Sequence, residues 1–534
     1  MTPASIRPRG SFAHWPLLLL VAVLTFGAYE YILSYWTFGP EFAGYWYFFH
    51  GVPFQRVVER YTWFHLPWYR PTAFVLFYWI GERFFDWHNI LAWKAFNLST
   101  AVGCSFLIYW LVQVLFGRQL LGGMFAALYF LLHPTLYVVV FEISAFDFTH
   151  TFFGLLTVIT YVLASRAKGT RSLLLTAAAL ASYILALTSK EITVVTPVML
   201  AFASALELVR NRERKPAVWT REFLRLLPFF ALLVAYWWIH IRHIPADWGT
   251  SAASDYRRVV NFRMIFENVV KYPMWLLRIF TFTGDRTGHA AEYATITNSL
   301  AGLLLAATSL WGLAKALRRD LSLIWPYLLL LGFIAVFLIV PVYSGGYLWH
   351  ANLALAGYSA LFGFGFGQAL DAIPQYRWRI TAVALVLAGF FVLARVNVNQ
   401  FLHGDGRRSI YRMIYYLIDK PPLPAARMKG TPLVLVEDAK EMGWWAYGGG
   451  SGLVRYIYDN PKIQERITPR LDTVPVQTCQ EWMRRPDAYY LRYDHLYRWF
   501  DASAEFRQHC TVLMTPKPAP AQPKAVAVKA GSRS

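Results

Sequence analysis

Two short stretches place positive charge directly beside apolar segments. Arg70 precedes Pro71 and the apolar run that begins there, and Lys190 stands with Glu191 between two apolar runs. Charged side chains are costly in a membrane, so charge in such positions indicates a function. A guanidinium binds phosphate through two parallel hydrogen bonds, and an ammonium offers a compact positive charge. We therefore predict that both cations bind a phosphate, with Glu191 orienting Lys190.

Each of these residues also has a simpler explanation. Arg70 would then be an interfacial arginine whose charged end reaches into the headgroup zone. Lys190 and Glu191 would form an ion pair with each other, or Glu191 would cap the helix that follows. Position along the chain does not separate these alternatives, and both stay open.

Acidic residues that could act as a general base lie in two regions. Glu30 lies near the end of the first apolar run and Glu41 follows in the loop. We favour Glu41 because Glu30 can still belong to the last turn of that helix. Glu142 and Asp147 lie in an otherwise apolar segment. Five residues correspond to about 140° around a regular helix, so these two carboxylates face the same way only if the helix breaks. We expect one to serve chemistry and the other structure.

Histidine and cysteine spacing does not indicate a metal site. His150 follows Asp147 by about one turn, and we expect it to hydrogen-bond to that carboxylate. Cys104 lies in an apolar run and is expected to be a packing residue. Cys479 and Cys510 lie in a charged C-terminal region, where an oxidising compartment would allow a disulfide between them. The sequence predicts no metal site and indicates no particular cofactor.

The composition is that of an integral membrane protein. Of 534 residues, 57% are hydrophobic and 15% charged, and the mean hydropathy is +0.36. Apolar runs that reach roughly 20 residues with their flanking residues are predicted to span the membrane, and we count eleven. These runs cover residues 16–33, 90–116, 120–132, 152–164, 173–187, 193–205, 223–240, 300–313, 323–341, 348–366 and 380–394. The first run has no small-residue cleavage site and is expected to stay as an anchor.

The net charge of +20 follows the predicted topology. Arginine and lysine gather before the first span and in the loops after the second, fourth, sixth, eighth and tenth spans. Positively charged loops stay in the cytoplasm, which places the amino terminus inside and the C-terminal region outside. The charge is thus explained without a nucleic-acid partner.

Three regions are predicted along the chain. Residues 1–396 form the transmembrane domain, and its first outer loop is rich in aromatic residues, as interfacial helices are. Residues 397–515 form a small outer α/β domain, with strands at 431–436 and 489–493. Residues 516–534 are rich in proline, alanine and lysine and are expected to be disordered. The predicted fold class is a mostly α, polytopic helix bundle with a small α/β outer domain.

The order of these motifs resembles that of the C-type (GT-C) glycosyltransferases. An acidic residue in the first outer loop is followed by Tyr69-Arg70-Pro71, by His133-Pro134 with two acids, and by Ser189-Lys190-Glu191. The resemblance covers about residues 10 to 400 and is greatest to bacterial relatives of the tetratricopeptide-linked O-mannosyltransferases. Tyr347-Leu348-Trp349 is similar to a further family element, but Gly346 stands where the family often has arginine.

The resemblance implies an inverting transfer of a sugar from a polyprenyl-phosphate donor, on the outer face of a bacterial inner membrane. Arg70 and Lys190 would bind the leaving phosphate, and Tyr69, His133 and Tyr347 would contact the substrates. The partners implied are the lipid-linked donor, membrane lipids and an envelope acceptor that is a lipid, a glycan or a protein.

One departure from the family pattern concerns the general base. The family usually has an aspartate after the first span, but this chain has none before Asp86, so Glu41 would take its place. If no glutamate serves, the base would be Glu142 or Asp147, or the protein would be a catalytically silent membrane scaffold. A lipid-linked sugar transporter or flippase is a further alternative, although the internally repeated halves common in transporters are not evident.

Overall fold

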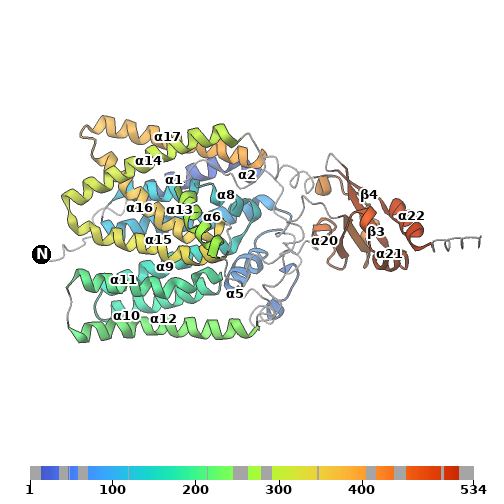
Figure 1. Ribbon diagram of the computed structural model, residues 1–534, viewed down its shortest axis with the longest axis horizontal. Coiled ribbons are helices and arrows are strands. Elements are labelled where there is room, and N and C mark those ends of the chain that lie inside the picture. The colour runs from blue at the N-terminus through green and yellow to red at the C-terminus, as the bar shows by residue number, and fades with distance from the viewer. Residues whose placement is uncertain are drawn as a thin grey trace, which may run out of the picture.

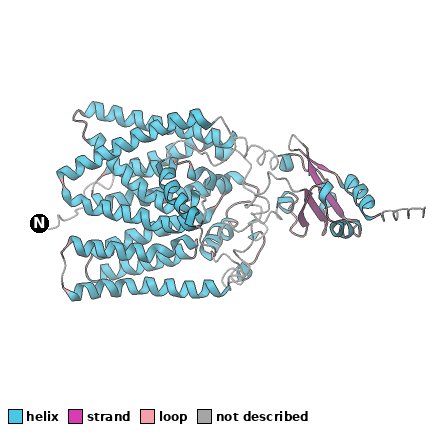
Figure 2. Cartoon of the chain, viewed as in Figure 1, coloured by secondary structure: helices cyan, strands magenta, loops and turns pink. Residues whose placement is uncertain are grey.

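The computed structural model describes residues 14–34, 42, 46, 49–57, 70–117, 119–212, 215–243, 262–277, 291–344, 348–403, 416–437, 453–494 and 498–515. A bundle of long helices forms most of it, and a small domain lies beyond one end of the bundle (Figure 1). Figure 2 shows that the strands of the described chain belong to this small domain. The predicted fold class is thereby confirmed.

Long apolar segments form the helices of the bundle, because a helix satisfies every backbone hydrogen bond within the segment. The long helices are α1 (His14–Ala28), α6 (Ile90–Phe116), α7 (Leu120–Leu132), α9 (Ala145–Arg166), α10 (Gly169–Leu187), α11 (Thr196–Arg210), α12 (Pro216–His243), α13 (Phe262–Leu277), α14 (Ala291–Arg319), α15 (Ile324–Ser344), α16 (Asn352–Asp371) and α17 (Tyr376–His403). Shorter elements connect them: α2 (Glu30–Ser34), α5 (Pro71–Ala73), the π-helix η2 (Phe74–Trp79), α8 (Thr135–Glu142), and the 3-10 helices η3 (Glu191–Val195), η4 (Leu321–Leu323) and η5 (Leu348–Ala351).

Each of the eleven predicted apolar runs lies in one of these helices or in two consecutive ones. Length and hydropathy qualify seven segments of the described chain to cross a membrane, or eight if the bent pair α7 and α8 forms one span. The seven are Ile90–Phe116, Ala145–Arg166, Gly169–Leu187, Glu191–Arg210, Leu321–Val342, Asn352–Asp371 and Tyr376–Asn399. The total of eleven spans stays a prediction.

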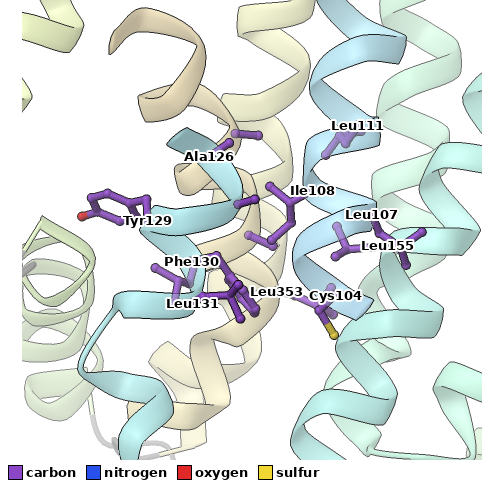
Figure 3. Packing of buried hydrophobic residues seen from close by; sticks show 14 of the residues in the cluster. Cys104, Leu107, Ile108, Leu111, Ala126, Tyr129, Phe130, Leu131, Leu155 and Leu353 are labelled. Carbon is purple, nitrogen blue, oxygen red and sulfur yellow. The ribbon is translucent and has the colours of Figure 1, made fainter. Parts of the chain in front are cut away.

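Helix α16 packs closely against both α7 and α14, and both contacts depend on small residues. A Cβ atom added to Gly363 would overlap the backbone of Ala126, and one added to Gly312 would overlap the carbonyl of Gly365. Small residues let membrane helices approach closely, where packing replaces the hydrophobic effect as the attraction between them. Figure 3 shows part of this core, and its labelled side chains include Cys104, the packing cysteine of α6.

The small domain contains a four-stranded sheet with the strand order β2-β1-β3-β4. β1 (Leu433–Glu437) pairs in parallel with β2 (Gln464–Thr468) and β3 (Ala488–Tyr493), and β4 (Trp499–Asp501) is antiparallel to β3. Every residue of β1 is buried, as a central strand covered on both faces requires. The two predicted strands are therefore confirmed with shifts of one or two residues at their ends.

Short helices connect and cover the strands: α20 (Leu453–Ile457), α21 (Val476–Met483) and α22 (Ser503–Met514). The structure pairs Cys479 of α21 with Cys510 of α22 in a disulfide, with their Cα atoms 5.2 Å apart. The last helix of the bundle, α17, continues to His403, seven residues past the end predicted for the transmembrane domain at residue 396. Residues 516–534, which were expected to be disordered, lie outside the described residues.

The small sheet domain packs on residues of the segment that precedes α6. The hydroxyl of Tyr456 in α20 donates to the carbonyl of Trp87 at 3.0 Å, and the ring of His88 stacks on that of Tyr456 with centroids 4.8 Å apart. Phe42 and Trp46 of this segment contact the same tyrosine. These aromatic contacts connect the small domain to the segment that leads into the first residue of α6.

Candidate functional site

Two ion pairs, one fully buried and one partly buried, lie side by side at the end of the bundle nearest the sheet domain, where α5 begins (Figure 1). The Nε and Nη2 atoms of Arg70 donate to the two carboxylate oxygens of Glu191, at 2.9 and 2.5 Å. The ammonium of Lys190 donates to Oδ1 of Asp147, and both side chains are at most 1% exposed. Both cations approach the ring of Phe146, with Arg70 Cζ 4.7 Å and Lys190 Nζ 5.0 Å from its centroid. Residues distant in sequence thus converge on one aromatic ring.

The convergence depends on a direct connection between α5 and the end of α10. The backbone N–H of Thr72 donates to the carbonyl of Thr188 at 3.1 Å, and their hydroxyls are 2.6 Å apart. Pro71 occupies the first turn of α5, a position that does not require its missing N–H. These contacts fix Arg70, which precedes α5, beside the residues that follow Thr188.

Extended backbone at Lys190 separates two charges that are adjacent in sequence. Lys190 has φ −160° and ψ 137°, and Glu191 begins η3. Successive side chains point in opposite directions along extended backbone, so the two do not share one partner. Glu191 binds Arg70 and Asp147 binds Lys190. The expectation that Glu191 orients Lys190 is thereby corrected, because Asp147 holds this lysine.

The helix breaks between Glu142 and Asp147. On a continuous helix the two carboxylates would face different directions, so this break allows both to lie near one site. α8 ends at Glu142, Ile143 adopts the left-handed conformation with φ 57°, and α9 begins at Ala145. The hydroxyl of Ser144 donates to Oδ2 of Asp147 at 2.7 Å. Because Lys190 binds the other oxygen, Asp147 acts as a fixed counter-ion.

Two buried histidines lie close to the ion pairs. His150 on α9 contacts the carbonyl of Phe146 through Nδ1 at 2.8 Å, whereas the sequence predicted Asp147 as its partner. His350 of η5 was not predicted and follows the Tyr347-Leu348-Trp349 motif by one residue. His350 is buried and interacts electrostatically with Lys190.

The structure places two other predicted residues at contacts between helices. His133 contacts the carbonyl of Trp275 through Nε2 at 3.2 Å and the hydroxyl of Thr135 through Nδ1 at 2.7 Å. It thereby joins the end of α7 to α13. Glu30 forms an ion pair with Arg395 of α17 on the exposed surface. Neither contact brings its residue to the Phe146 ring.

Three predicted residues, Glu41, Tyr69 and Tyr347, lie outside the described residues. Within the described ranges, no three histidine, cysteine, aspartate or glutamate side chains converge as metal ligands. Phe146 could not be identified from the sequence, because 18% of the chain is aromatic and one more phenylalanine carries no signal.

The arrangement is suited to stabilising negative charge. The two ion pairs sum to zero net charge, so the buried charges compensate one another, and each cation is held before any anion arrives. Fixed hydrogen-bond donors in a site that excludes water stabilise a developing negative charge without reorganising.

Comparison with solved structures shows that this fold is shared. ArnT from Cupriavidus metallidurans, in its structure bound to undecaprenyl phosphate, matches with a TM-score of 0.52 and 12% identity over 91% of this chain and 94% of ArnT. The Archaeoglobus fulgidus oligosaccharyltransferase in the apo form matches with a TM-score of 0.49 and 13% identity, and the match spans 64% of that longer protein. The match to ArnT shows that the two chains share a fold over nearly their whole lengths. No protein-family model and no curated protein matches its sequence.

Proposed function

We propose that this chain is an integral membrane glycosyltransferase that moves a sugar from a polyprenyl-phosphate donor to an envelope acceptor, with inversion. The observation that carries this proposal is the convergence of Arg70 and Lys190 on the Phe146 ring. The shared fold with ArnT, whose structure contains undecaprenyl phosphate, supports the same donor class.

The two cations would stabilise the leaving group. As the bond between the anomeric carbon and the phosphate oxygen breaks, its electron pair stays on the phosphate, whose negative charge grows. Arg70 and Lys190 would bind that charge, while Glu191 and Asp147 hold them in position. The burial of Lys190 and Asp147 lowers the local dielectric, so such contacts count for more there than in water.

The opposite side of the sugar requires a base that takes the proton of the acceptor hydroxyl as its oxygen attacks the anomeric carbon. A single displacement of this kind inverts the anomeric centre. We propose Glu41 as this base, supported by the packing of its chain neighbour Phe42 against Trp87 of the first outer loop and Trp93 of α6. Glu142, at the end of α8, is the second candidate.

The remaining parts of the chain would help to select the acceptor and would set the orientation of the protein in the membrane. The outer domain packs on the first loop through Tyr456, so it is placed to help select the acceptor. The basic loops identified in the sequence would face the cytoplasm of a bacterial inner membrane, and the sheet domain would face outward. An oxidising outer compartment is consistent with the disulfide between Cys479 and Cys510.

Binding of undecaprenyl phosphate to the purified full-length protein tests the phosphate site. Arg70→Ala and Lys190→Ala should each weaken binding roughly 10- to 100-fold, the value of a hydrogen bond to a charged group. Arg395→Ala, which removes an exposed arginine from its ion pair with Glu30, is the control and should leave the affinity unchanged. Equal affinity in all variants, or no binding by the parent protein, would overturn the proposal.

Transfer itself is tested with a panel of polyprenyl-phosphate sugars. Glu41→Gln should keep its affinity for undecaprenyl phosphate and lose turnover, since the amide cannot take the proton. Parental turnover in both Glu41→Gln and Lys190→Ala would refute the assigned roles. Movement of lipid-linked sugar across a liposome without glycosidic product would instead indicate a flippase. Unchanged envelope glycans and lipids in cells lacking the protein would favour a silent scaffold.

A further inference from the structure

The π-helix η2 connects the arginine side of the site to the acidic turn. It follows α5 directly, so the same short segment begins at Arg70 and ends at Trp79. Single π-turns inside helices are uncommon and occur frequently at functional sites. Tyr78 in this turn is fully buried, and its ring stacks on Phe49 and on Trp93 with centroids 5.6 and 6.2 Å apart. The orientation of its hydroxyl is therefore fixed by packing.

That hydroxyl lies on the turn between the two acids. It donates to the carbonyl of Ile143 at 2.7 Å and lies 3.5 Å from the N–H of Ala145, from which it accepts. Ile143 has φ 57°, a conformation that a β-branched residue strongly disfavours. Such a conformation persists only where the surrounding structure fixes it. Within the described chain, the Tyr78 hydroxyl is the side-chain group that bonds this turn on both sides of Ser144.

The turn determines where two site residues lie. Phe146 and Asp147 directly follow Ala145 in the first turn of α9. Asp147 is held by the Ser144 hydroxyl and pairs with Lys190, and Phe146 supplies the ring that both cations approach. A change in the turn would therefore move the partners of both cations together.

We propose that Tyr78 is a positioning residue, which holds the Ile143 turn so that Phe146 and Asp147 meet the two cations. One segment, residues 70–79, then sets both halves of the site. Arg70 at its start binds Glu191, and Tyr78 near its end bonds the turn that precedes Asp147, the partner of Lys190. The consequence for phosphate binding rests on the proposed function, whereas the consequence for Lys190 does not.

Tyr78→Phe removes the hydroxyl alone, and the chain offers a matched control. Tyr29 is also fully buried, and its hydroxyl also donates to a backbone carbonyl, that of Leu131, at 2.7 Å. Tyr29→Phe therefore removes the same kind of hydrogen bond elsewhere in the bundle. Both variants should lose similar thermal stability, since a buried hydrogen bond of this kind contributes a comparable amount in each place.

Acetylation of Lys190 by acetic anhydride, followed by mass spectrometry, reports on the ion pair without any assumption about function. Lys190 is 1% exposed and should react slowly in the parent protein. Tyr78→Phe should raise its rate of acetylation about tenfold, as loss of one hydrogen bond makes opening of the turn easier. Tyr29→Phe should change the rate less than twofold. Equal rates in the two variants would overturn the proposal.

A second variant separates positioning from a general loss of packing. Ile143→Gly places at φ 57° a residue that adopts this conformation freely, so the turn no longer depends on the hydroxyl. In this background, Tyr78→Phe should raise the acetylation rate of Lys190 much less than in the parent, a non-additive result that coupled residues give. Additive effects would contradict the role assigned to Tyr78.

The affinity for undecaprenyl phosphate connects this role to the proposed function. Tyr78→Phe should weaken it about tenfold and Tyr29→Phe should not. If Lys190 becomes reactive in Tyr78→Phe but the parent protein does not bind undecaprenyl phosphate, the positioning role stands and the proposed function fails. If the parent protein binds and Tyr78→Phe changes neither the reactivity nor the affinity, the positioning role fails and the proposed function stands.

Discussion

Replacing Lys190 by methionine removes one charge of a buried ion pair while keeping a long apolar side chain. Asp147 is 0% exposed; it would lose the ammonium of Lys190 and keep the hydrogen bond that the Ser144 hydroxyl donates. Leaving such a carboxylate without its cation typically costs about 3–5 kcal/mol of unfolding free energy. We therefore expect Lys190→Met to lower the thermal unfolding midpoint by several degrees.

A double variant distinguishes the cost of an isolated charge from the loss of the ion pair. Apolar replacement of both partners, as in Lys190→Met with Asp147→Leu, is often neutral or stabilising, because no buried charge remains. The double variant should thus regain most of the stability that Lys190→Met loses. Its affinity for undecaprenyl phosphate should stay low, because the cation that would bind the phosphate is still absent.

Thermal unfolding of the full chain in detergent is the measurement, and Arg395→Met is the control. The ion pair between Arg395 and Glu30 lies on the exposed surface, where water and salt screen it, so its loss should change the midpoint little. If Lys190→Met and Arg395→Met lower the midpoint equally, or if the double variant is less stable than Lys190→Met, the argument from buried charge is refuted.

Three further predictions concern parts of the chain away from the ion pairs. Burial raises the pKa of Glu465 to about 8, so the protonated carboxyl contributes its full stability to the small domain below its usual pKa, and this contribution is lost as the pH rises through 8. Glu465→Gln should flatten this loss of stability with pH, measured by hydrogen exchange in β1. Gly312→Ala should destabilise the bundle by about 1–3 kcal/mol in thermal unfolding, since its Cβ would overlap the Gly365 carbonyl. Reducing the disulfide between Cys479 and Cys510, 31 residues apart, should cost the outer domain about 2–4 kcal/mol, measured by its resistance to proteolysis.

Controls for these predictions come from the same elements. A Cβ on Gly389 of α17 would meet no atom within 4 Å, so Gly389→Ala should not destabilise the bundle. A reductant should not change the resistance to proteolysis of a variant in which both Cys479 and Cys510 are alanine. Stability of Glu465→Gln that falls with pH as steeply as in the parent would show that another group controls the decline.

Prediction from the sequence succeeded where the signal is local. Apolar runs predicted the helices, because a chain in lipid must satisfy its own backbone hydrogen bonds within each segment. The strands at 433–437 and 488–493 were identifiable as short apolar or aromatic runs in a charged region. Arg70 and Lys190 stood out as charges next to apolar segments, a pattern that requires no knowledge of the fold.

The pairing of charges could not be predicted in this way. Lys190 and Glu191 are neighbours in sequence, but extended backbone at Lys190 directs the two side chains to different partners. Those partners are 43 and 121 residues away, Asp147 for the lysine and Arg70 for the glutamate. Which side chains meet over such separations depends on how the helices pack, and spacing along the chain does not contain that information.

What the sequence determined by itself is a chain of apolar helices with a few costly charges and a small C-terminal sheet, since composition and period are properties of each segment. What only the tertiary structure decided is that Arg70 and Lys190 share the Phe146 ring and that a left-handed Ile143 places Asp147 there. The physical reason is that a helix is stabilised within its own segment, whereas a buried charge is stabilised only by the partner that the folded chain brings to it.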